Sequence, residues 1–401
     1  MNISPDCKAE RVHGRQRKRD TKGRITVKLG ILVTIISGFG KKGFYQSQEV
    51  GLGKMLTERG HEVQIYKCVA GDQPADENQI NDRLSIRYIP VRSVGVHGIF
   101  PVSQLDKRLD GLLCFSDTQI FLPHVIRFCE KNGIAFVPYV GIAHSAQKNL
   151  KSRVMDKIFA AGTLRYYKKM PVIAKSEGVR QELTELGITE TVTAPVGLDE
   201  KVLKLDYASY DRKTIRAELG YTDQDVVISF VGRIKPEKSP IEAVEMFGRI
   251  RNRKPFKLLM VGEGFLLDDV RAKIAELGLN DRVQLIERVP YEDMWKIHWA
   301  ADYFINLCTR EIFGMALLES VLYRSSAAAL RAPGPDTILE GMKGHALCNH
   351  FDEVAEWLTG DYPTPDELAE SSARLLERFS WKNCAERFEE FTERVRKAGE
   401  E

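Results

Sequence analysis

The chain has 401 residues, more than one hydrophobic core usually organises, so two domains are expected. Apolar residues make up 43% and charged residues 29% of the sequence, which excludes a disordered or membrane-spanning protein. The net charge of +3 hides a basic start, because residues 1–28 carry nine Lys or Arg against three acids. We interpret residues 1–27 as a solvated, disordered tail; binding to nucleic acid or anionic lipid is the alternative, and no nucleic-acid partner is expected.

The seven cysteines are scattered, odd in number and free of any zinc-like spacing. This pattern indicates reduced thiols and a cytoplasmic protein without a metal site. The first thirty residues contain basic side chains but no apolar segment behind them, so no secretory signal is expected.

Short apolar runs alternate with helical patterns along the chain, which is typical of an α/β fold with parallel sheets covered on both faces. The first series of expected strands lies at 31–36, 63–65, 111–115, 135–140 and 172–174. The second series lies at 226–231, 257–261, 283–286 and 303–307. We therefore predict two doubly wound domains, 28–200 and 201–380, followed by a helix at 381–401 that returns to the first domain. Ligands are expected in the cleft between them, at the carboxyl ends of the strands.

A glycine cluster, Gly38-Phe-Gly40-Lys-Lys-Gly43, follows the first strand and matches a dinucleotide-binding motif. A nicotinamide or flavin cofactor also needs an acidic residue after the second strand, and residues 63–68 supply none. A dinucleotide cofactor is therefore not expected. The cluster is either a phosphate-binding turn or an ordinary tight turn, and both interpretations stay open.

Two cations, Arg233 and Lys238, follow the strand 226–231. A departing nucleoside diphosphate gains negative charge on its β-phosphate, which cations fixed at this edge of a sheet would stabilise without a metal ion. The alternative is that both are solvated loop charges.

Two carboxylates, Glu311 and Glu319, are eight positions apart after the expected strand 303–307. On a single helix they would lie about 12 Å apart, which is too far for the carboxylate pair of a glycosidase. That separation suits one ligand with a sugar at one end and a ribose at the other. The N–H groups of Gly314, Met315 and Ala316 would then face a diphosphate between them.

These residues belong to a longer set of motifs that resembles the retaining glycosyltransferases of family four, which have the GT-B fold. The first domain matches at Gly43, at Arg59-Gly-His-Glu-Val63, at Ser176-Glu177 and at Val196-Gly-Leu-Asp199. The second domain matches at Val231-Gly-Arg233 with Lys238, Met260-Val-Gly-Glu-Gly264, residues 277–283, Ala300-Ala-Asp302, the Glu311 and Glu319 pair, and Phe379-Ser-Trp381. The resemblance implies two facing Rossmann-like domains with a deep cleft between them.

The resemblance also implies roles for individual residues. Arg233 and Lys238 would bind the donor diphosphate, Glu319 the ribose and Glu311 the donor sugar. Gly314, Met315 and Ala316 would present amides to phosphate and sugar, and Gly43 would contact the donor from the first domain. His144, after the strand 135–140, would face the transferred sugar. A structural histidine is the alternative for His144, and no chemistry is assigned to His61. Asp117 is expected to cap a turn rather than to face the cleft.

The chain departs from the family where Arg324 and Ser326 replace a usual glycine and proline after Glu319. We expect this helix end to be built differently, which puts base selection and full activity in doubt. The glycine that usually precedes the Val289-Pro290 turn is also absent.

The stretch Lys148 to Lys169 carries seven Lys or Arg against one acid, while Leu150, Val154, Ile158 and Ala161 recur at helical spacing. We predict a basic amphipathic helix. It either rests on an anionic membrane or covers the core with its apolar side as an ordinary surface helix.

Taken together, the sequence predicts a metal-independent retaining enzyme that transfers a sugar from a UDP or GDP sugar to a glycan, lipid-linked or small-molecule acceptor. A pathway to cell-surface polysaccharide or glycoconjugate is expected, in the cytoplasm or at the inner face of the membrane. The alternatives are a catalytically silent subunit of a partner transferase and a nucleotide-sugar epimerase or phosphorylase on the same fold.

Overall fold

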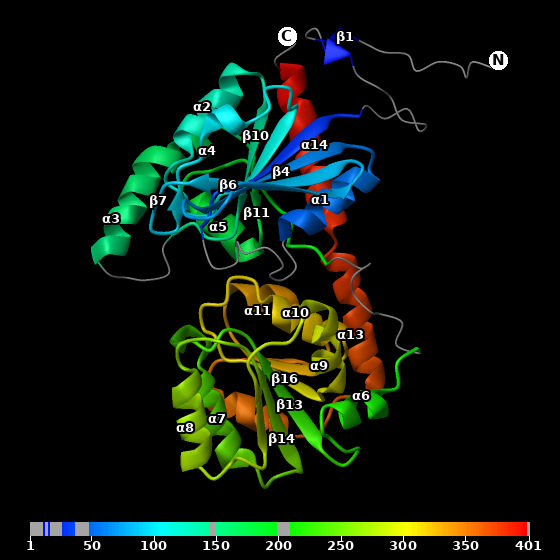
Figure 1. Cartoon of the computed structure of the whole chain (residues 1–401). Coiled ribbons are helices and arrows are strands. Elements are labelled where there is room, and N and C mark those ends of the chain that lie inside the picture. The colour runs from blue at the N-terminus through cyan, green and yellow to red at the C-terminus, as the bar shows by residue number, and fades with distance from the viewer. Residues whose placement is uncertain are drawn as a thin grey trace, which may run out of the picture. The chain divides into compact units, whose positions relative to one another are not determined.

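The computed structural model describes residues 11–12, 15–16, 26–36, 48–144, 150–198 and 209–398, and it divides into two compact units (Figure 1). Unit 1 comprises residues 1–197 and 380–401, and unit 2 comprises residues 198–379. The glycine cluster at 38–43, most of the basic tail and the segment 199–208 lie outside the described residues.

Unit 1 is built on an eight-stranded sheet in the order β12-β11-β10-β9-β3-β4-β6-β5. All neighbouring strands are parallel except β5 and β6. The strands are β3 (Lys28–Val33), β4 (Glu62–Ala70), β5 (Asp76–Asn81), β6 (Leu84–Val91), β9 (Gly111–Phe115), β10 (Ala135–Val140), β11 (Val172–Ala174) and β12 (Thr191–Thr193). A small hairpin, β7 (Ser93–Val94) and β8 (His97–Gly98), and the pair β1 (Arg11–Val12) and β2 (Arg15–Gln16) lie outside this sheet.

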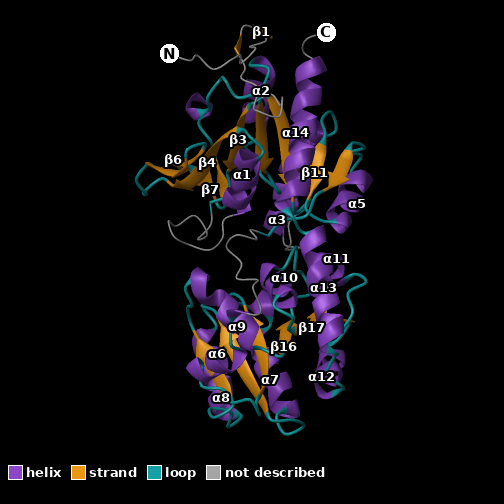
Figure 2. Ribbon diagram, turned by 90° about the vertical axis from the view of Figure 1, so that its right-hand side faces the viewer, coloured by secondary structure: helices purple, strands orange, loops and turns teal. Residues whose placement is uncertain are grey.

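The helices of unit 1 cover both faces of its sheet. Leu112 and Cys114 of β9 pack in one core cluster with Val125 and Ile126 of α2. Figure 2 shows α1 and α14 together in front of the sheet, as one layer. The helices are α1 (Gln48–Glu58), α2 (Pro123–Lys131), α3 (Leu150–Phe159), α4 (Arg165–Tyr167), α5 (Glu177–Glu185) and α14 (Trp381–Ala398). The doubly wound arrangement predicted from the alternating pattern is confirmed.

The antiparallel edge strand β5 was not expected from the sequence. Its residues, Asp-Glu-Asn-Gln-Ile-Asn, are largely polar and alternate between intermediate and exposed positions. Among the described strands β5 pairs only with β6, at the edge of the sheet. Its polar sequence carries no hydrophobic periodicity that would have revealed a strand.

The C-terminal helix α14 is tied to unit 1 by a polar cluster at the Arg59-Gly-His61 turn. The guanidinium of Arg59 donates two hydrogen bonds to the carboxylate of Glu389, at 2.6 and 2.7 Å, and His61 Nε2 lies 2.9 Å from the same group. Burial alone would raise the pKa of Glu389, but the hydrogen bonds from Arg59 and His61 outweigh it and lower the pKa to about 2. The motif at residues 59–63 therefore has a structural role, and His61 holds a helix in place.

Trp381 at the start of α14 packs directly onto backbone at two glycines. A Cβ on Gly197 would lie 2.2 Å from the Trp381 amide nitrogen, and one on Gly51 would lie 2.3 Å from its indole nitrogen. Neither position has room for a side chain. The Val-Gly motif near residue 197 and the Phe-Ser-Trp motif near residue 381 are thus two halves of one contact.

Unit 2 has a six-stranded, wholly parallel sheet in the order β15-β14-β13-β16-β17-β18. Numbered within the unit this is 3-2-1-4-5-6, the doubly wound order of dinucleotide-binding domains. The strands are β13 (Val226–Val231), β14 (Phe256–Val261), β15 (Val283–Ile286), β16 (Tyr303–Asn306), β17 (Ser326–Leu330) and β18 (Ala346–Cys348). The helices are α6 (Arg212–Glu218), α7 (Pro240–Ile250), α8 (Leu267–Glu276), α9 (Met294–Ala300), α10 (Met315–Leu322), α11 (Pro333–Leu339), α12 (Phe351–Thr359) and α13 (Pro365–Arg378).

Among the described residues, no helix combines the length and apolar character needed to cross a bilayer. Six cysteines in the same part of the chain are buried and unlinked. Cys7 lies outside it.

Candidate functional site

The strand order of unit 2 locates its ligand site. In the sheet, β14 and β15 lie on one side of β13, whereas β16, β17 and β18 lie on its other side, so the strand order reverses between β13 and β16. In such sheets ligands bind at the carboxyl ends of the two strands where the order reverses. Lys238 follows β13 and Glu311 follows β16, so both predicted donor residues lie at this switch point.

The loop after β13 is shaped by close backbone contacts with the loop after β14. Gly232 N–H donates to the Val261 carbonyl at 3.0 Å, and Ile234 N–H donates to the Glu263 carbonyl at 2.9 Å. Gly262 has φ 153°, and a Cβ there would lie 1.8 Å from the Gly232 carbonyl oxygen. These glycines let the two loops continue the sheet.

The two cations of the loop after β13 differ in their exposure to solvent. Arg233 is exposed, whereas Lys238 ends a short 3-10 turn, Pro236–Lys238, and is half-buried. Ser239, in the left-handed region at φ 53°, redirects the chain into α7.

A polar cluster joins Lys238, Glu311 and Asn306. The Lys238 ammonium forms an ion pair with Glu311 Oε2, and Asn306 Nδ2 donates to the same oxygen at 3.3 Å. Asn306 Oδ1 in turn accepts from the Cys308 amide at 3.1 Å, and the Gly334 amide donates to the Glu311 carbonyl at 2.8 Å. The Lys238 and Glu311 side chains are only 22% and 14% exposed, so the two charges are held in place and partly shielded from water.

Asn306 was not singled out from the sequence. In the sequence, Asn306 is a polar residue at the end of an apolar strand. Many strands end in a polar residue, so a single sequence does not show that this one has a role in a site. Burial raises the pKa of the neighbouring Cys308 thiol.

Helix α10 begins at Met315, with Gly314 at its N-cap in the left-handed region at φ 91° and ψ 62°. A Cβ on Gly314 would lie 3.2 Å from Glu311 Cγ. The first turn of the helix therefore starts beside the Glu311 carboxylate, and the amides of Met315 and Ala316 belong to the first turn, where N–H groups have no partner within a helix. Glu311 precedes the helix, so the single-helix spacing of Glu311 and Glu319 considered above is wrong.

Glu319, in the second turn of α10, belongs to a separate contact. Its side chain is almost fully buried, and His298 Nε2 from α9 lies 3.5 Å from Glu319 Oε2. The imidazole is itself buried and lies parallel to the Tyr323 ring, with the ring centroids 6.1 Å apart. His298 therefore lies beside Glu319 at ion-pair distance, although neither of its ring nitrogens makes a hydrogen bond within the described residues. The sequence did not reveal this contact because α9 reads as an ordinary amphipathic helix.

The end of α10 corrects another expectation. Arg324 N–H donates to the Val321 carbonyl and Ser325 N–H to the Ser320 carbonyl, both at 3.0 Å, which is the hydrogen-bond pattern of a Schellman motif. Arg324 has φ 62°, so the helix ends in the same left-handed turn that a glycine would make. The expectation that this end is built differently is wrong. The Arg324 side chain is exposed, and Ser326 is buried with its hydroxyl donating to the Gly344 carbonyl at 2.9 Å.

Replacing Arg324 with glycine is expected to stabilise the protein. A left-handed conformation costs a residue with a Cβ about 1–2 kcal/mol, which glycine avoids, although glycine gains entropy in the unfolded chain. We expect Arg324→Gly to raise the free energy of unfolding by about 0.5–1 kcal/mol in urea titrations. Ala272→Gly is the matched control, since Ala272 is exposed inside α8 and this change is expected to cost about 1 kcal/mol. A loss of stability in Arg324→Gly would contradict the strain argument.

In unit 1, His144 is exposed, and its Nε2 lies 3.4 Å from the Glu182 carboxylate of α5. Gly43, the other unit 1 residue predicted to bind the donor, lies outside the described residues. Asp117, in a strained turn at φ 35°, accepts a hydrogen bond from the Gly141 amide at 2.6 Å. It thereby fixes the start of the segment that carries His144.

The predicted basic helix at Lys148 to Lys169 is only partly regular. Residues 150–159 form α3, a π-helical turn occupies Ala160–Leu164, and α4 is a single turn at Arg165–Tyr167. Lys148 lies outside the described residues. A helix is confirmed over residues 150–167, but it widens to a π-helical turn at Ala160–Leu164, next to the buried core residues Leu164 and Tyr167.

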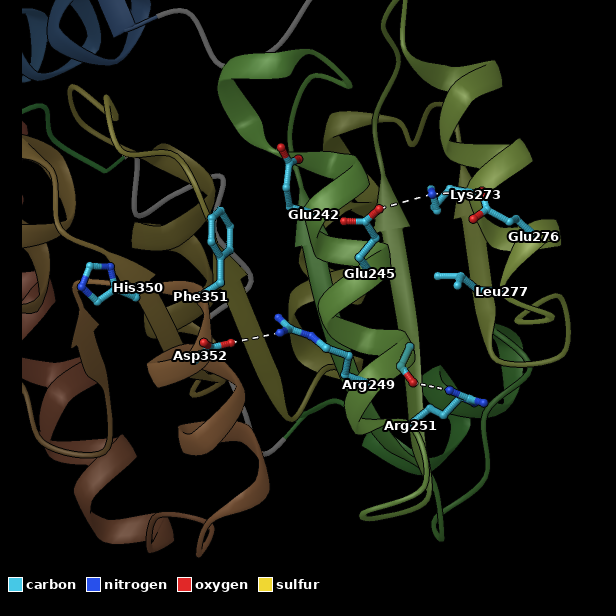
Figure 3. A pocket seen from close by; sticks show the side chains of 11 residues that line it. Glu242, Glu245, Arg249, Arg251, Lys273, Glu276, Leu277, His350, Phe351 and Asp352 are labelled. Carbon is cyan, nitrogen blue, oxygen red and sulfur yellow. Dashed lines mark hydrogen bonds and ion pairs between the residues drawn. The ribbon is translucent and has the colours of Figure 1, made fainter.

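Figure 3 shows a polar pocket of about 890 Å³ on unit 2, lined by residues of α7, α8 and α12. Its charges pair with one another: Lys273 lies 3.3 Å from Glu245, and Arg249 lies 3.0 Å from Asp352. None of the residues predicted to bind the donor lines it. The predicted donor residues of unit 2 therefore lie away from this pocket, and Lys238 and Glu311 are at the switch point.

The fold and the residues at the switch point agree with a match to known proteins. Residues 211–390, somewhat less than half of the chain, match the family described as Glycosyl transferases group 1. The two Rossmann-like units have the GT-B fold.

Individual relatives are distant. A D-inositol 3-phosphate glycosyltransferase of Nocardia farcinica is 29% identical over 195 residues, which is 45% of this chain and 43% of that protein. An uncharacterized glycosyltransferase of Methanocaldococcus jannaschii is 24% identical over 367 residues, covering 84% of this chain and 90% of that protein. The structure of Anabaena HepE in complex with UDP and glucose aligns with a TM-score of 0.66 at 15% identity, over 91% of this chain and 98% of the other.

Proposed function

We propose that the chain is a retaining, metal-independent glycosyltransferase that uses a UDP or GDP sugar as donor. The observation that carries this proposal is the partly buried Lys238 and Glu311 pair beside the N-terminus of α10, at the switch point of a 3-2-1-4-5-6 sheet. At one point the site offers a cation and helix amides, which suit the diphosphate of a nucleotide sugar, and a carboxylate, which suits the hydroxyls of the sugar.

The donor would be divided among these groups. Lys238, with Arg233 on the same loop, would neutralise the diphosphate, and the amides of Met315 and Ala316 would donate to its oxygens. Glu311 would accept hydrogen bonds from sugar hydroxyls, and Glu319, beside His298, would accept them from the ribose. A UDP complex of a neighbour with the same fold supports this choice of donor.

Catalysis would come mainly from stabilising the leaving group. The bond between the anomeric carbon and the β-phosphate oxygen breaks while the acceptor oxygen bonds to the same face of that carbon. The acceptor proton passes to the departing phosphate oxygen, so configuration is retained without a covalent enzyme intermediate. Lys238 acts where negative charge grows, which is how such groups lower a barrier without a metal ion.

The acceptor would be held by unit 1. The carboxyl edge of its sheet carries His144, and also Asp117 with Lys175 at 3.8 Å. The name of the Nocardia relative records a small phosphorylated acceptor, and a glycan or a lipid-linked acceptor would fit the same plan. We place the reaction in the cytoplasm or at the inner face of the membrane, in the synthesis of surface polysaccharide or glycoconjugate.

Thermal unfolding with a panel of UDP, GDP and ADP, with and without sugar, tests the donor proposal. A nucleotide present at 100 times its dissociation constant stabilises the bound state by about 2.7 kcal/mol, so we expect one base to raise the melting temperature by about 5 °C or more. Glu319→Ala should abolish this shift, whereas Glu377→Ala on α13 should keep it. A wild-type protein that responds to no nucleotide would refute the donor site. Conversion of the nucleotide sugar into its epimer, with no acceptor and no net release of nucleoside diphosphate, would indicate an epimerase instead.

A further inference from the structure

Unit 1 exposes large apolar side chains in two segments. Among its described residues, all but one of the exposed large hydrophobic residues lie either on α3 or on the β7–β8 hairpin; Val395 is the exception. The α3 residues are Leu150, Val154 and Ile158, at 78%, 49% and 46% exposure, and the hairpin residues are Val94, Val96 and Ile99, at 52%, 49% and 40%. Exposed apolar residues are usually scattered, and clusters of them mark a binding surface.

The three residues of α3 form a stripe. They are spaced by four, so they lie one above another on a single side of the helix over about 12 Å. Phe159, at the end of α3, is buried in the core and anchors the helix there. Figure 1 shows the rest of α3 extending away from the sheet. The apolar stripe therefore faces solvent, which excludes the ordinary surface helix whose apolar side covers the core.

Positive charge accompanies both apolar segments. Arg153 and Lys157 are exposed beside the stripe, and Arg165, Lys168 and Lys169 are exposed just beyond it. Asp156 is the one acidic residue between positions 150 and 169, and the hairpin segment 92–99 contains Arg92 and no acid. A second copy of the chain placed on this surface would bring like charges together, whereas anionic lipid would match both the charge and the apolar stripe.

The hairpin and α3 lie at the same edge of the sheet. The Gly98 amide of the hairpin donates to the Thr34 carbonyl at the end of β3, at 3.1 Å, and Ile35 pairs with His97. Helix α3 follows the carboxyl end of β10, which is also the end that β3 reaches, because the strands are parallel. Figures 1 and 2 both place the two segments at this end of unit 1.

We propose that α3 and the β7–β8 hairpin form a docking surface for an anionic lipid bilayer. The apolar side chains enter the boundary between headgroups and acyl chains, and the cations contact lipid phosphates. Docking would bring the carboxyl edge of the unit 1 sheet to the membrane. The benefit of this position, access to a lipid-linked acceptor, rests on the proposed function, but the lipid binding itself does not.

Sedimentation of the full chain with vesicles tests the surface. We expect binding to vesicles of phosphatidylcholine mixed with phosphatidylglycerol, weak binding to phosphatidylcholine alone, and a decrease with salt. The variant Leu150→Ser/Val154→Ser/Ile158→Ser should weaken binding to the mixed vesicles by about tenfold or more, and Val94→Ser/Val96→Ser by several fold. The control Phe265→Ser/Tyr362→Ser removes two exposed apolar residues of unit 2 and should bind as wild type.

The charge is tested in the same way. Arg153→Glu/Lys157→Glu should lose binding to the mixed vesicles, whereas Lys213→Glu/Lys343→Glu, with the same change in net charge on unit 2, should lose much less. All of these side chains are exposed, and unchanged melting would show that the variants fold. Nucleotide-induced stabilisation of the α3 variant should persist, which separates this proposal from the donor site.

Several results would overturn the docking surface. One is a wild-type protein that ignores anionic vesicles, and another is an α3 or charge variant that binds them as wild type does. Gel filtration that shows a dimer converted to monomer by the α3 substitutions would assign the surface to a second copy of the chain instead.

Discussion

Lys238→Met is expected to lower the rate of sugar transfer by about 10²–10³, the usual loss when one group that stabilises developing charge is removed. Methionine keeps the length and apolar stem of the side chain but carries no charge, so the departing diphosphate loses its partner. Glu311→Gln should also reduce the rate, because its carboxylate holds Lys238 and would hold the sugar. Initial rates of nucleoside diphosphate release in the presence of acceptor measure both effects.

Lys213→Met serves as the control, since Lys213 is 77% exposed and pairs with Asp223 on the surface of unit 2. It should leave the rate within a factor of two of wild type. If Lys238→Met and Glu311→Gln change nothing while a partner protein is present and product still forms, the chain is a silent subunit and the partner is the transferase.

Trp381→Ala is expected to have the largest effect on stability. Its side chain is 3% exposed and packs on the bare backbone of Gly51 and Gly197, so removing it leaves a cavity that the glycines cannot fill. Losses of about 3–5 kcal/mol are usual for a buried tryptophan. The loss should appear in unit 1, as faster amide hydrogen exchange in β10 and α1, while the strands of unit 2 keep their protection.

Two further variants bear on this contact. Gly197→Ala should also destabilise unit 1, because its Cβ would meet the Trp381 backbone, and backbone cannot swing aside as a flexible side chain can. Phe265→Ala is the control, since that ring is 70% exposed and its removal should cost less than about 0.5 kcal/mol. Equal protection of unit 1 in wild type and Trp381→Ala would show that the tryptophan is not a structural anchor.

The fold could be predicted because each strand of a parallel sheet that is covered on both faces appears in the sequence as a short run of apolar residues. The strands ending at Phe115, Val140 and Val231 all carry this signal, and the α/β class with two doubly wound domains is confirmed. Five strands of the two main sheets were missed: β5, β6, β12, β17 and β18. The edge strand β5 is too polar, and β17, Ser-Ala-Ala-Ala-Leu, lacks the β-branched and aromatic residues typical of strands.

The candidate donor site was predicted in part. Lys238 and Glu311 were chosen by motif, and the structure brings them together, although their roles toward a donor stay a proposal. Asn306 and His298 were not foreseen, because each contacts another residue of the site and such contacts depend on packing across elements. For Arg324 the sequence predicted a change that the structure does not have. A left-handed turn disfavours any residue with a Cβ, but Arg324 adopts this conformation and the helix ends there as it would at a glycine.

The position of α14 has a consequence for the order in which the protein folds during its synthesis. Cys384, Phe388 and Phe391 of this helix are at most 2% exposed, so residues 1–197 alone would leave part of one apolar face of their sheet, beside α1, uncovered. Unit 2 is continuous from 198 to 379 and can close its core as soon as it leaves the ribosome. The ribosome therefore makes most of unit 1 first, but unit 1 completes its fold only after unit 2, when residues 380–401 have been made. Until then it exposes apolar surface that would make it a target for chaperones and proteases.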